Sequence, residues 1–198
     1  VPKVFEVRDV PPRFVVRLEG SRLFSTDGGH VSHSEDGGRT WSEPIQPCRK
    51  DGSALEGKFQ SVKLLSSGNL AGICRRYDEA LRERFPHRWW PDMFFVTSDD
   101  GGLTWSTGIR VGAPGDVLQG VRNSLFQLRS GRLILPVDWD VSDYAHPEYR
   151  GEGEGHSFRG GYGWFQGRRM LVEGHDHTPE FYGTIVYYSD DLGQTWRS

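Results

Sequence analysis

The sequence contains three copies of one eight-residue phrase: SEDGGRTW at residues 34–41, SDDGGLTW at 98–105 and SDDLGQTW at 189–196. All three fit the pattern S-x-D-x-G-x-T-W, and each follows a run of residues typical of a β-strand. A phrase that recurs at spacings of tens of residues indicates a chain built from repeated supersecondary units. We therefore place the rest of the sequence around these three copies.

The residue types in the phrase suit a tight hairpin turn. The Asp carboxylate can accept hydrogen bonds from backbone N–H groups just ahead of it, and the Gly two residues later permits a positive φ. Ser and Thr hydroxyls can bridge the two arms, while the Trp can bury a large apolar area between neighbouring units. We expect a structural role for the phrase, because its polar groups satisfy the turn itself. The Asp and Trp positions are Asp36 and Trp41, Asp100 and Trp105, and Asp191 and Trp196.

In residues and spacing, the phrase resembles the Asp box of the sialidase (BNR-repeat) superfamily. This resemblance implies an all-β fold, a β-propeller of four-stranded antiparallel blades, with an Asp box between the third and fourth strands of a blade. It also implies that the Asp boxes lie on the rim opposite the active site. Propellers close with four to eight blades, so three phrases predict part of a larger propeller of six blades. We expect one domain over residues 1–198, with blades at about 4–50, 57–115 and 119–198.

Composition supports an all-β protein and excludes two classes of function. The 198 residues include 26 Gly and 13% aromatic residues, which suits many turns and strands. The net charge of −3 gives no electrostatic footprint for nucleic acid, and no apolar run approaches the roughly 20 residues of a membrane helix. Cys48 and Cys74 can pair or remain small buried side chains, which leaves the compartment undecided. The chain starts at Val1 without Met, which fits a processed N-terminus, and we favour a secreted or periplasmic location over a cytoplasmic one.

Apolar alternation between Gly-containing turns predicts the strands of each unit. The long insert after the second strand of the third unit adds an expected hairpin around Gly167, and 79–85 could form a short helical turn. The expected strands are 14–18, 22–25 and 30–34, then 59–65, 70–74 and 92–97, then 121–128, 133–138 and 184–188, with hairpin arms at 160–166 and 168–173.

The loops that follow the second strands are expected on the rim opposite the Asp boxes, at 75–92 and 138–182. All four Trp residues outside the Asp boxes fall in these two loops: Trp89, Trp90, Trp139 and Trp164. Sugars stack their C–H faces on aromatic rings, so this distribution suits a carbohydrate site. The alternative is that these rings cover the blade ends.

The second unit matches the first catalytic blade of the superfamily, in which an arginine ends the second strand and the following loop carries the acid. Arg75 or Arg76 stands at that strand end, and Asp78 or Asp92 stands where the acid is expected. QSV at 60–62 replaces the Arg-Ile-Pro triplet that opens the first strand in the superfamily. The nearest echo of the triplet is RNSL at 122–125, which adds Arg122 and Asn123 to the substrate-binding candidates.

The chemistry of a sialic acid explains these residue types. Its carboxylate suits an arginine fork, and the same charge would repel a carboxylate nucleophile, so sialidases use a tyrosine that a glutamate activates. Tyr182 with Glu180 could supply that pair here, as could Tyr149 with Glu148, and the resemblance also allows both residues to come from later blades. Asp138, Trp139 and Asp140, together with Trp90, are expected to contact substrate.

These observations predict a sialidase-like glycoside hydrolase that acts on a terminal acidic sugar of a glycan. The first alternative is a non-catalytic BNR-repeat propeller that binds carbohydrate or a protein partner, and the second is a polysaccharide lyase on the same fold. The run His175-Asp176-His177 lacks a third placed ligand, so we expect no metal and no cofactor.

Overall fold

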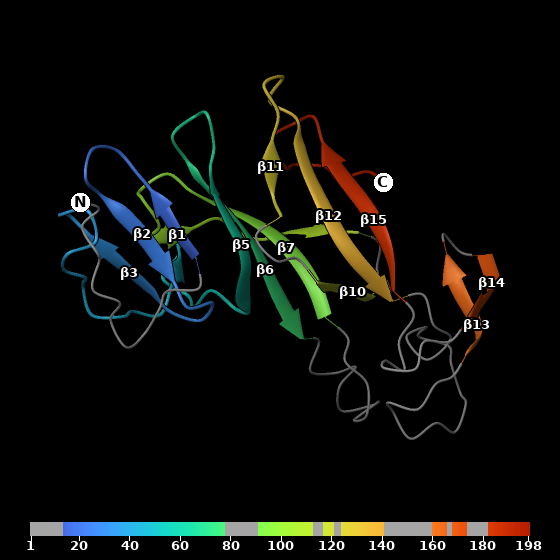
Figure 1. The fold of residues 1–198 in the computed structure, drawn as a ribbon. Helices are drawn as coiled ribbons and strands as arrows, with labels where there is room; N and C mark the ends of the chain where they lie inside the picture. Colours follow the sequence, from blue (N-terminus) through green and yellow to red (C-terminus); the bar gives the residue numbers. More distant parts are fainter. Residues whose placement is uncertain are drawn as a thin grey trace, which may run out of the picture.

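The computed structural model of the chain describes residues 14–77, 91–112, 117–120, 124–140, 160–165, 168–173 and 182–198. All regular elements in these ranges are β-strands, and all but one short pairing are antiparallel. Three main sheets lie side by side in the order of the sequence, from β1, β2 and β3 on the left of the view to β12 and β15 on the right (Figure 1). The described residues thus form an all-β fold, and they include no helix long and apolar enough to cross a membrane.

The first sheet contains β1 (Phe14–Arg17), β2 (Leu23–Thr26) and β3 (Val31–Ser34) in sequential antiparallel order. The phrase at 34–41 follows β3 directly, and the chain then returns to the sheet, where Ile45 forms an antiparallel bridge with Val31. This bridge follows the phrase, where a four-stranded blade has its fourth strand.

The second sheet is the most complete, with order β5-β6-β7-β9. Its strands are β5 (Lys58–Leu64), β6 (Leu70–Tyr77), β7 (Pro91–Ser98) and β9 (Ile109–Val111). The phrase at 98–105 connects β7 to β9 and includes β8 (Thr104–Trp105), which pairs in parallel with β4 (Cys48–Arg49). The parallel pair ties the end of the first unit to the second.

The third sheet is built on β12 (Leu133–Asp140), which pairs along its whole length with β15 (Tyr182–Ser189). The single first strand predicted at 121–128 is wrong in form: β10 (Val117–Gly120) pairs with the end of β12, and β11 (Phe126–Gln127) pairs with its start. A register irregularity in the β10–β12 pairing accompanies this division. The expected hairpin in the insert is present as β13 (Gly160–Phe165) and β14 (Arg168–Glu173).

The three sheets share one register, which allows their residues to be matched. In each sheet the leucine that begins the second strand pairs with the serine that opens the phrase. These pairs are Leu23 with Ser34, Leu70 with Ser98, and Leu133 with Ser189. Counting from these pairs identifies equivalent positions in the three sheets.

Apolar side chains fill the two layers between the sheets. Trp105 is fully buried between the first two sheets, where its ring contacts Phe24 and Phe59. Trp196 is half-buried in the second layer and meets Phe95 edge to face. Cys74 lies in the first layer, and burial raises the pKa of its thiol. Cys48 and Cys74 are both free thiols, so the pairing left open from the sequence does not occur.

Candidate functional site

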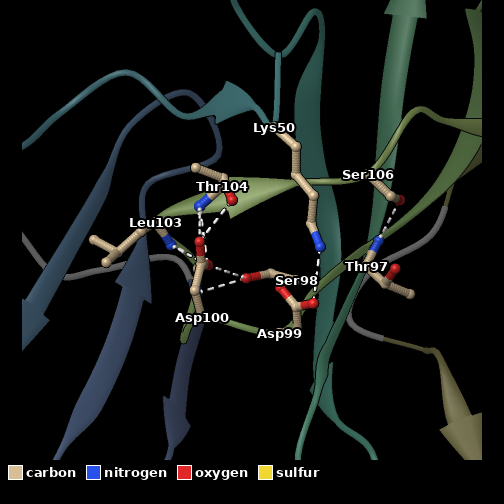
Figure 2. A network of polar contacts seen from close by, with 9 residues as sticks. Lys50, Thr97, Ser98, Asp99, Asp100, Leu103, Thr104 and Ser106 are labelled. Atoms are coloured by element: carbon tan, nitrogen blue, oxygen red, sulfur yellow. Dashed lines mark hydrogen bonds and ion pairs between the residues drawn. The ribbon is translucent and has the colours of Figure 1, made fainter. Parts of the chain in front are cut away.

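The phrase at 98–105 forms a closed hydrogen-bond system (Figure 2). The Oδ1 atom of Asp100 accepts from the backbone N–H groups of Leu103 and Thr104, at 3.0 Å each, and from the Ser98 hydroxyl at 2.7 Å. Its Oδ2 atom accepts from the Thr104 hydroxyl at 2.6 Å. The Ser98 hydroxyl also accepts from Gly102 N at 2.8 Å, so these polar groups bind one another and hold the turn.

The same contacts recur at the two other phrases. Ser34 and Ser189 donate to the Asp at 2.9 and 2.8 Å, and Thr40 and Thr195 donate to its second oxygen at 2.7 and 2.6 Å. Hydrogen bonds from Thr195 lower the pKa of Asp191 to about 2, and those from Thr40 lower the pKa of Asp36 well below its usual range. All three Asp side chains act as ionised acceptors within a turn.

The charged candidates of the second sheet lie at its other end. Asp92 is the second residue of β7, and Ser98 is its last residue. At a rise of about 3.3 Å per residue, six residues separate the two by about 20 Å. Strand pairing sets Arg76 opposite Asp92, and Lys58 opposite Arg75, at this same end. The sheet therefore has one end made by the phrase and one end rich in charge.

Asp92 is held by an arginine that sequence reasoning did not single out. Arg110 on β9 donates from Nη1 to Oδ2 of Asp92 at 3.2 Å and from Nη2 to Oδ1. The Asp92 side chain is only 12% exposed, against 32% for Arg110. Two parallel hydrogen bonds from a guanidinium favour the ionised form of a carboxylate. For Asp92 to act as a general acid, this pair would first have to open.

Arg76 is also engaged in a long-range contact. Its Nη1 donates to Oε2 of Glu56 at 2.8 Å, and its guanidinium lies 4.3 Å from the centre of the Phe94 ring. Arg49 approaches the same Glu56 oxygen at 3.6 Å. The Glu56 carboxylate thus contacts the guanidinium groups of both Arg49 and Arg76.

Gly57 brings the backbone close to Arg75. It has a φ of +96°, and a Cβ at this position would lie 2.6 Å from the carbonyl oxygen of Arg75 and 3.4 Å from Cβ of Arg76. A side chain at residue 57 would push against β6 where both arginines leave it. The glycine therefore allows the chain that enters β5 to lie directly against the two candidate arginines.

The third sheet places its candidates at the corresponding end. Asp138 pairs with Thr184, Trp139 with Gly183 and Asp140 with Tyr182, all at the end of β12 remote from the phrase at 189–196. The same stretch of β12 pairs with β10, which in turn contacts β7. Strand pairing thus brings Asp138, Trp139, Asp140 and Tyr182 into one region of the backbone, next to the second sheet.

Several predicted residues lie outside the described residues, so their roles stay predictions. These are Asp78, Trp89, Trp90, Arg122, Asn123, Glu148, Tyr149 and Glu180, and the helical turn expected at 79–85 also falls there. His175-Asp176-His177 also lies outside them, and within the described part of the chain no three His, Cys, Asp or Glu side chains gather as a metal site.

Arg110 and Glu56 are the polar partners of Asp92 and Arg76, and the sequence analysis identified neither of them. Arg110 is 18 residues from Asp92, and Glu56 is 20 residues from Arg76. A usable signal was the sequence Ile109-Arg110-Val111, in which one charged residue interrupts an apolar strand and must point away from the core.

Comparison with known proteins agrees with the repeat pattern. The model of the BNR/Asp-box repeat family matches residues 96–107 and 187–198, which contain the second and third phrases. The chain thus carries BNR/Asp-box repeats, and its resemblance to the sialidase/BNR-repeat superfamily is supported. No curated protein matches the sequence.

Two solved structures match over most of this chain, and this chain spans about half of the length of each of them. A protein of unknown function from Dyadobacter fermentans matches with a TM-score of 0.54 and 14% identity, over 92% of this chain and 48% of its own. A structure named Hadza microbial sialidase Hz136 matches with a TM-score of 0.43 and 16% identity, over 92% of this chain and 44% of its own. The first likeness supports the all-β fold.

Proposed function

We propose that this chain forms part of a sialidase-like β-propeller glycoside hydrolase that cleaves a terminal acidic sugar from a glycan. The observation that carries the proposal is the repeated unit itself: the same phrase at the same register position of three sheets, matched in two of them by the BNR/Asp-box repeat family. In this proposal each sheet is one blade, most complete in the four-stranded second sheet, and the charged ends remote from the Asp boxes form the substrate side.

The proposed roles follow from the chemistry of each side chain. Arg75 binds the sugar carboxylate, and Asp92 serves as the acid once substrate displaces Arg110 from it. Tyr182 and Glu180 are the candidate nucleophile and base. Asp138, Trp139 and Asp140 contact the sugar ring. Pairing of β12 with β15 supports the grouping, since it sets Tyr182 opposite Asp140.

A non-catalytic glycan-binding propeller is the second candidate, and a specific observation favours it. Asp92 and Arg76, the described acid and one of its two neighbouring arginines, are both held in ion pairs, with Arg110 and Glu56. Side chains held in this way can organise a binding surface without donating a proton.

Two measurements separate these candidates. Hydrolysis of a fluorogenic aryl sialoside, with the matching neutral galactoside as control, tests catalysis, and calorimetry with free sialic acid tests binding. Arg75→Ala should abolish both signals if the enzyme proposal holds. Arg132→Ala is the matched control, because Arg132 pairs with Asp190 of the third phrase, and it should change neither signal.

The outcomes are distinct. Binding without turnover, lost in Arg75→Ala, favours the glycan-binding module. Turnover that survives Arg75→Ala contradicts the assigned carboxylate-binding role, and a protein that neither binds nor cleaves the acidic sugar overturns both candidates.

A further inference from the structure

Arg75 and Arg76 leave β6 on opposite faces of the second sheet. Successive side chains alternate between the two faces of a strand, and Ile73 lies in the second apolar layer whereas Cys74 lies in the first. Arg75 therefore faces the third sheet, and Arg76 faces the first. The guanidinium group of Arg76 agrees with this, because it lies 4.3 Å from the centre of the Phe94 ring, and Phe94 pairs with Cys74. The two arginines thus present their charges on different sides of the sheet.

Arg76 belongs to a group of three side chains, Arg49, Glu56 and Arg76, which we call the arginine cluster. Arg76 donates from Nη1 to Oε2 of Glu56 at 2.8 Å, and Nη2 of Arg49 lies 3.6 Å from the same oxygen. Within the described part of the chain, no group donates a hydrogen bond to the other oxygen of Glu56. Two guanidinium groups thus face one oxygen of an internal carboxylate.

The guanidinium group of Arg49 keeps unused donors. Its Nε atom is buried and has no hydrogen-bond partner among the residues that the structure describes. Its contact with Glu56, at 3.6 Å, is longer than a hydrogen bond. A guanidinium group carries five N–H donors, and a buried donor without a partner is unfavourable. The arginine cluster therefore offers more donors than the Glu56 carboxylate accepts.

Glu56 is held weakly, whereas Arg76 is held in a fixed orientation. The Glu56 side chain is 57% exposed, and water screens ion pairs of exposed groups, so its contacts contribute little to stability. Arg76 stacks on Phe94, which orients its planar group for an acceptor with two oxygens. The arrangement matches a carboxylate site that Glu56 occupies until a carboxylate of a ligand replaces it.

We infer that the arginine cluster binds the carboxylate of a second acidic sugar in the glycan. The inference rests on the proposed function for the role of Arg75, which binds the terminal acidic sugar from the other side of the sheet. A sialic or uronic acid carries one carboxylate, so the two sites require two different sugars. The substrate class is therefore an oligosaccharide with carboxylated sugars at two or more positions, and Glu56 is the internal competitor for the second of them.

Calorimetry of the 198-residue chain with acidic sugars of different length tests the inference. The probes are sialic acid and its linear trimer, with galacturonic acid and its linear trimer to separate the two kinds of carboxylated sugar. We expect a trimer to bind about tenfold more tightly than its monomer, because its second carboxylate binds at a high effective concentration. Arg76→Gln should remove this advantage and leave the monomer affinity unchanged. Arg22→Gln is the matched control, because Arg22 pairs with Glu35 of the first phrase, and it should change neither affinity.

Glu56→Gln separates a ligand site from an ion pair that only supports the fold. An internal competitor lowers the fraction of chains that can bind, so its removal should raise the trimer affinity about threefold or more. Circular dichroism melting checks that each variant remains folded. A trimer affinity that Glu56→Gln leaves unchanged or weakens overturns the inference.

The remaining outcomes separate this inference from the proposed function. If the trimers bind no more tightly than the monomers, the arginine cluster is not a ligand site, while monomer binding that Arg75→Ala abolishes still supports the proposed function. If Arg76→Gln removes a trimer advantage and no aryl sialoside is hydrolysed, the second site stands and the hydrolase proposal fails. A chain that binds neither monomers nor trimers overturns both.

Discussion

The two ends of β7 organise polar groups in opposite ways. At Ser98 the partners are local, because the carboxylate of Asp100 binds groups no more than four residues away. At Asp92 the partners come from other strands, with Arg110 bound 18 residues along the chain and Glu56 bound to Arg76 across 20. The Asp100 turn is thus held by local hydrogen bonds, while the contacts of the other end exist only once the sheet has formed. That difference decides which end sequence can predict and how each end should respond to mutation.

The largest expected loss of stability tests whether the phrase at 98–105 depends on its packing against the neighbouring sheet. Trp105→Ala should lower the free energy of unfolding by about 3–5 kcal/mol, the usual cost of removing a buried aromatic ring. Trp41→Ala is the matched control, and it should cost less than half as much, because Trp41 is half-buried while Trp105 is fully buried. Urea unfolding measures both. Equal losses would mean that the ring stabilises its own turn and not the layer between sheets.

The local character of the Asp100 turn predicts a specific response to acid. Partial burial raises the pKa of Asp100, but hydrogen bonds led by those from Thr104 outweigh it and lower that pKa from 3.8 to about 2. Because the pKa in the folded state is the lower one, the stabilisation is complete above the unfolded pKa and is lost as pH falls through the folded value. Asp100→Asn should cost about 2 kcal/mol at neutral pH.

The measurement is the difference in unfolding free energy between wild type and Asp100→Asn as a function of pH. We expect it to be constant above about pH 4 and to shrink toward about pH 2. A difference that stays constant over this window contradicts the assignment of an ionised carboxylate to the turn.

Sequence predicted the Asp turns well, because the hydrogen bonds of their carboxylates join residues within one short stretch. Asp36, Asp100 and Asp191 could each be given an acceptor role from their spacing alone. The sequence predicted only part of the remote end. It indicated Asp92 and Arg76 as candidates, but it did not indicate their partners, because these depend on strand register. Arg110 reaches Asp92 because β9 pairs with β7 so that Arg110 faces Phe94, two residues from the acid. The division of the first strand of the third sheet was missed for a similar reason, since β10 and β11 pair with opposite ends of β12.

Double-mutant cycles compare ion pairs at the two ends of the same sheet. The pair of Asp92 with Arg110 is largely sheltered, and Asp92→Asn with Arg110→Met should give a coupling of about 1–2 kcal/mol. The pair of Lys50 with Asp99, the second residue of the phrase, has side chains that are 54% and 58% exposed (Figure 2). Its coupling should stay below about 0.5 kcal/mol, because water screens exposed charges. A stronger coupling at Lys50 than at Arg110 would reverse this ranking of the two ends.

The smallest expected effect on stability concerns the third phrase, in which one residue of the turn has an unfavourable backbone conformation. Leu192 adopts a φ of +58° at the position that Gly37 and Gly101 occupy in the other phrases. A non-glycine residue in this left-handed region destabilises the folded state by roughly 1–2 kcal/mol. Replacing it with glycine removes that cost, but glycine also increases the conformational entropy of the unfolded chain, which offsets part of the stabilisation. Leu192→Gly should therefore raise the free energy of unfolding by about 0.5 kcal/mol.

Gly37→Leu is the mirror control for this substitution, because Gly37 has a φ of +74° and no heavy atom within 4 Å of a Cβ placed there. It should destabilise the protein by about as much as Leu192→Gly stabilises it, since both changes act on the same backbone angle in open space. Opposite and similar shifts in chemical unfolding would show that the turn is energetically local in every copy. If Leu192→Gly destabilises instead, the exposed leucine contributes a contact that outweighs its backbone strain, and the phrase end is less self-contained than its hydrogen bonds indicate.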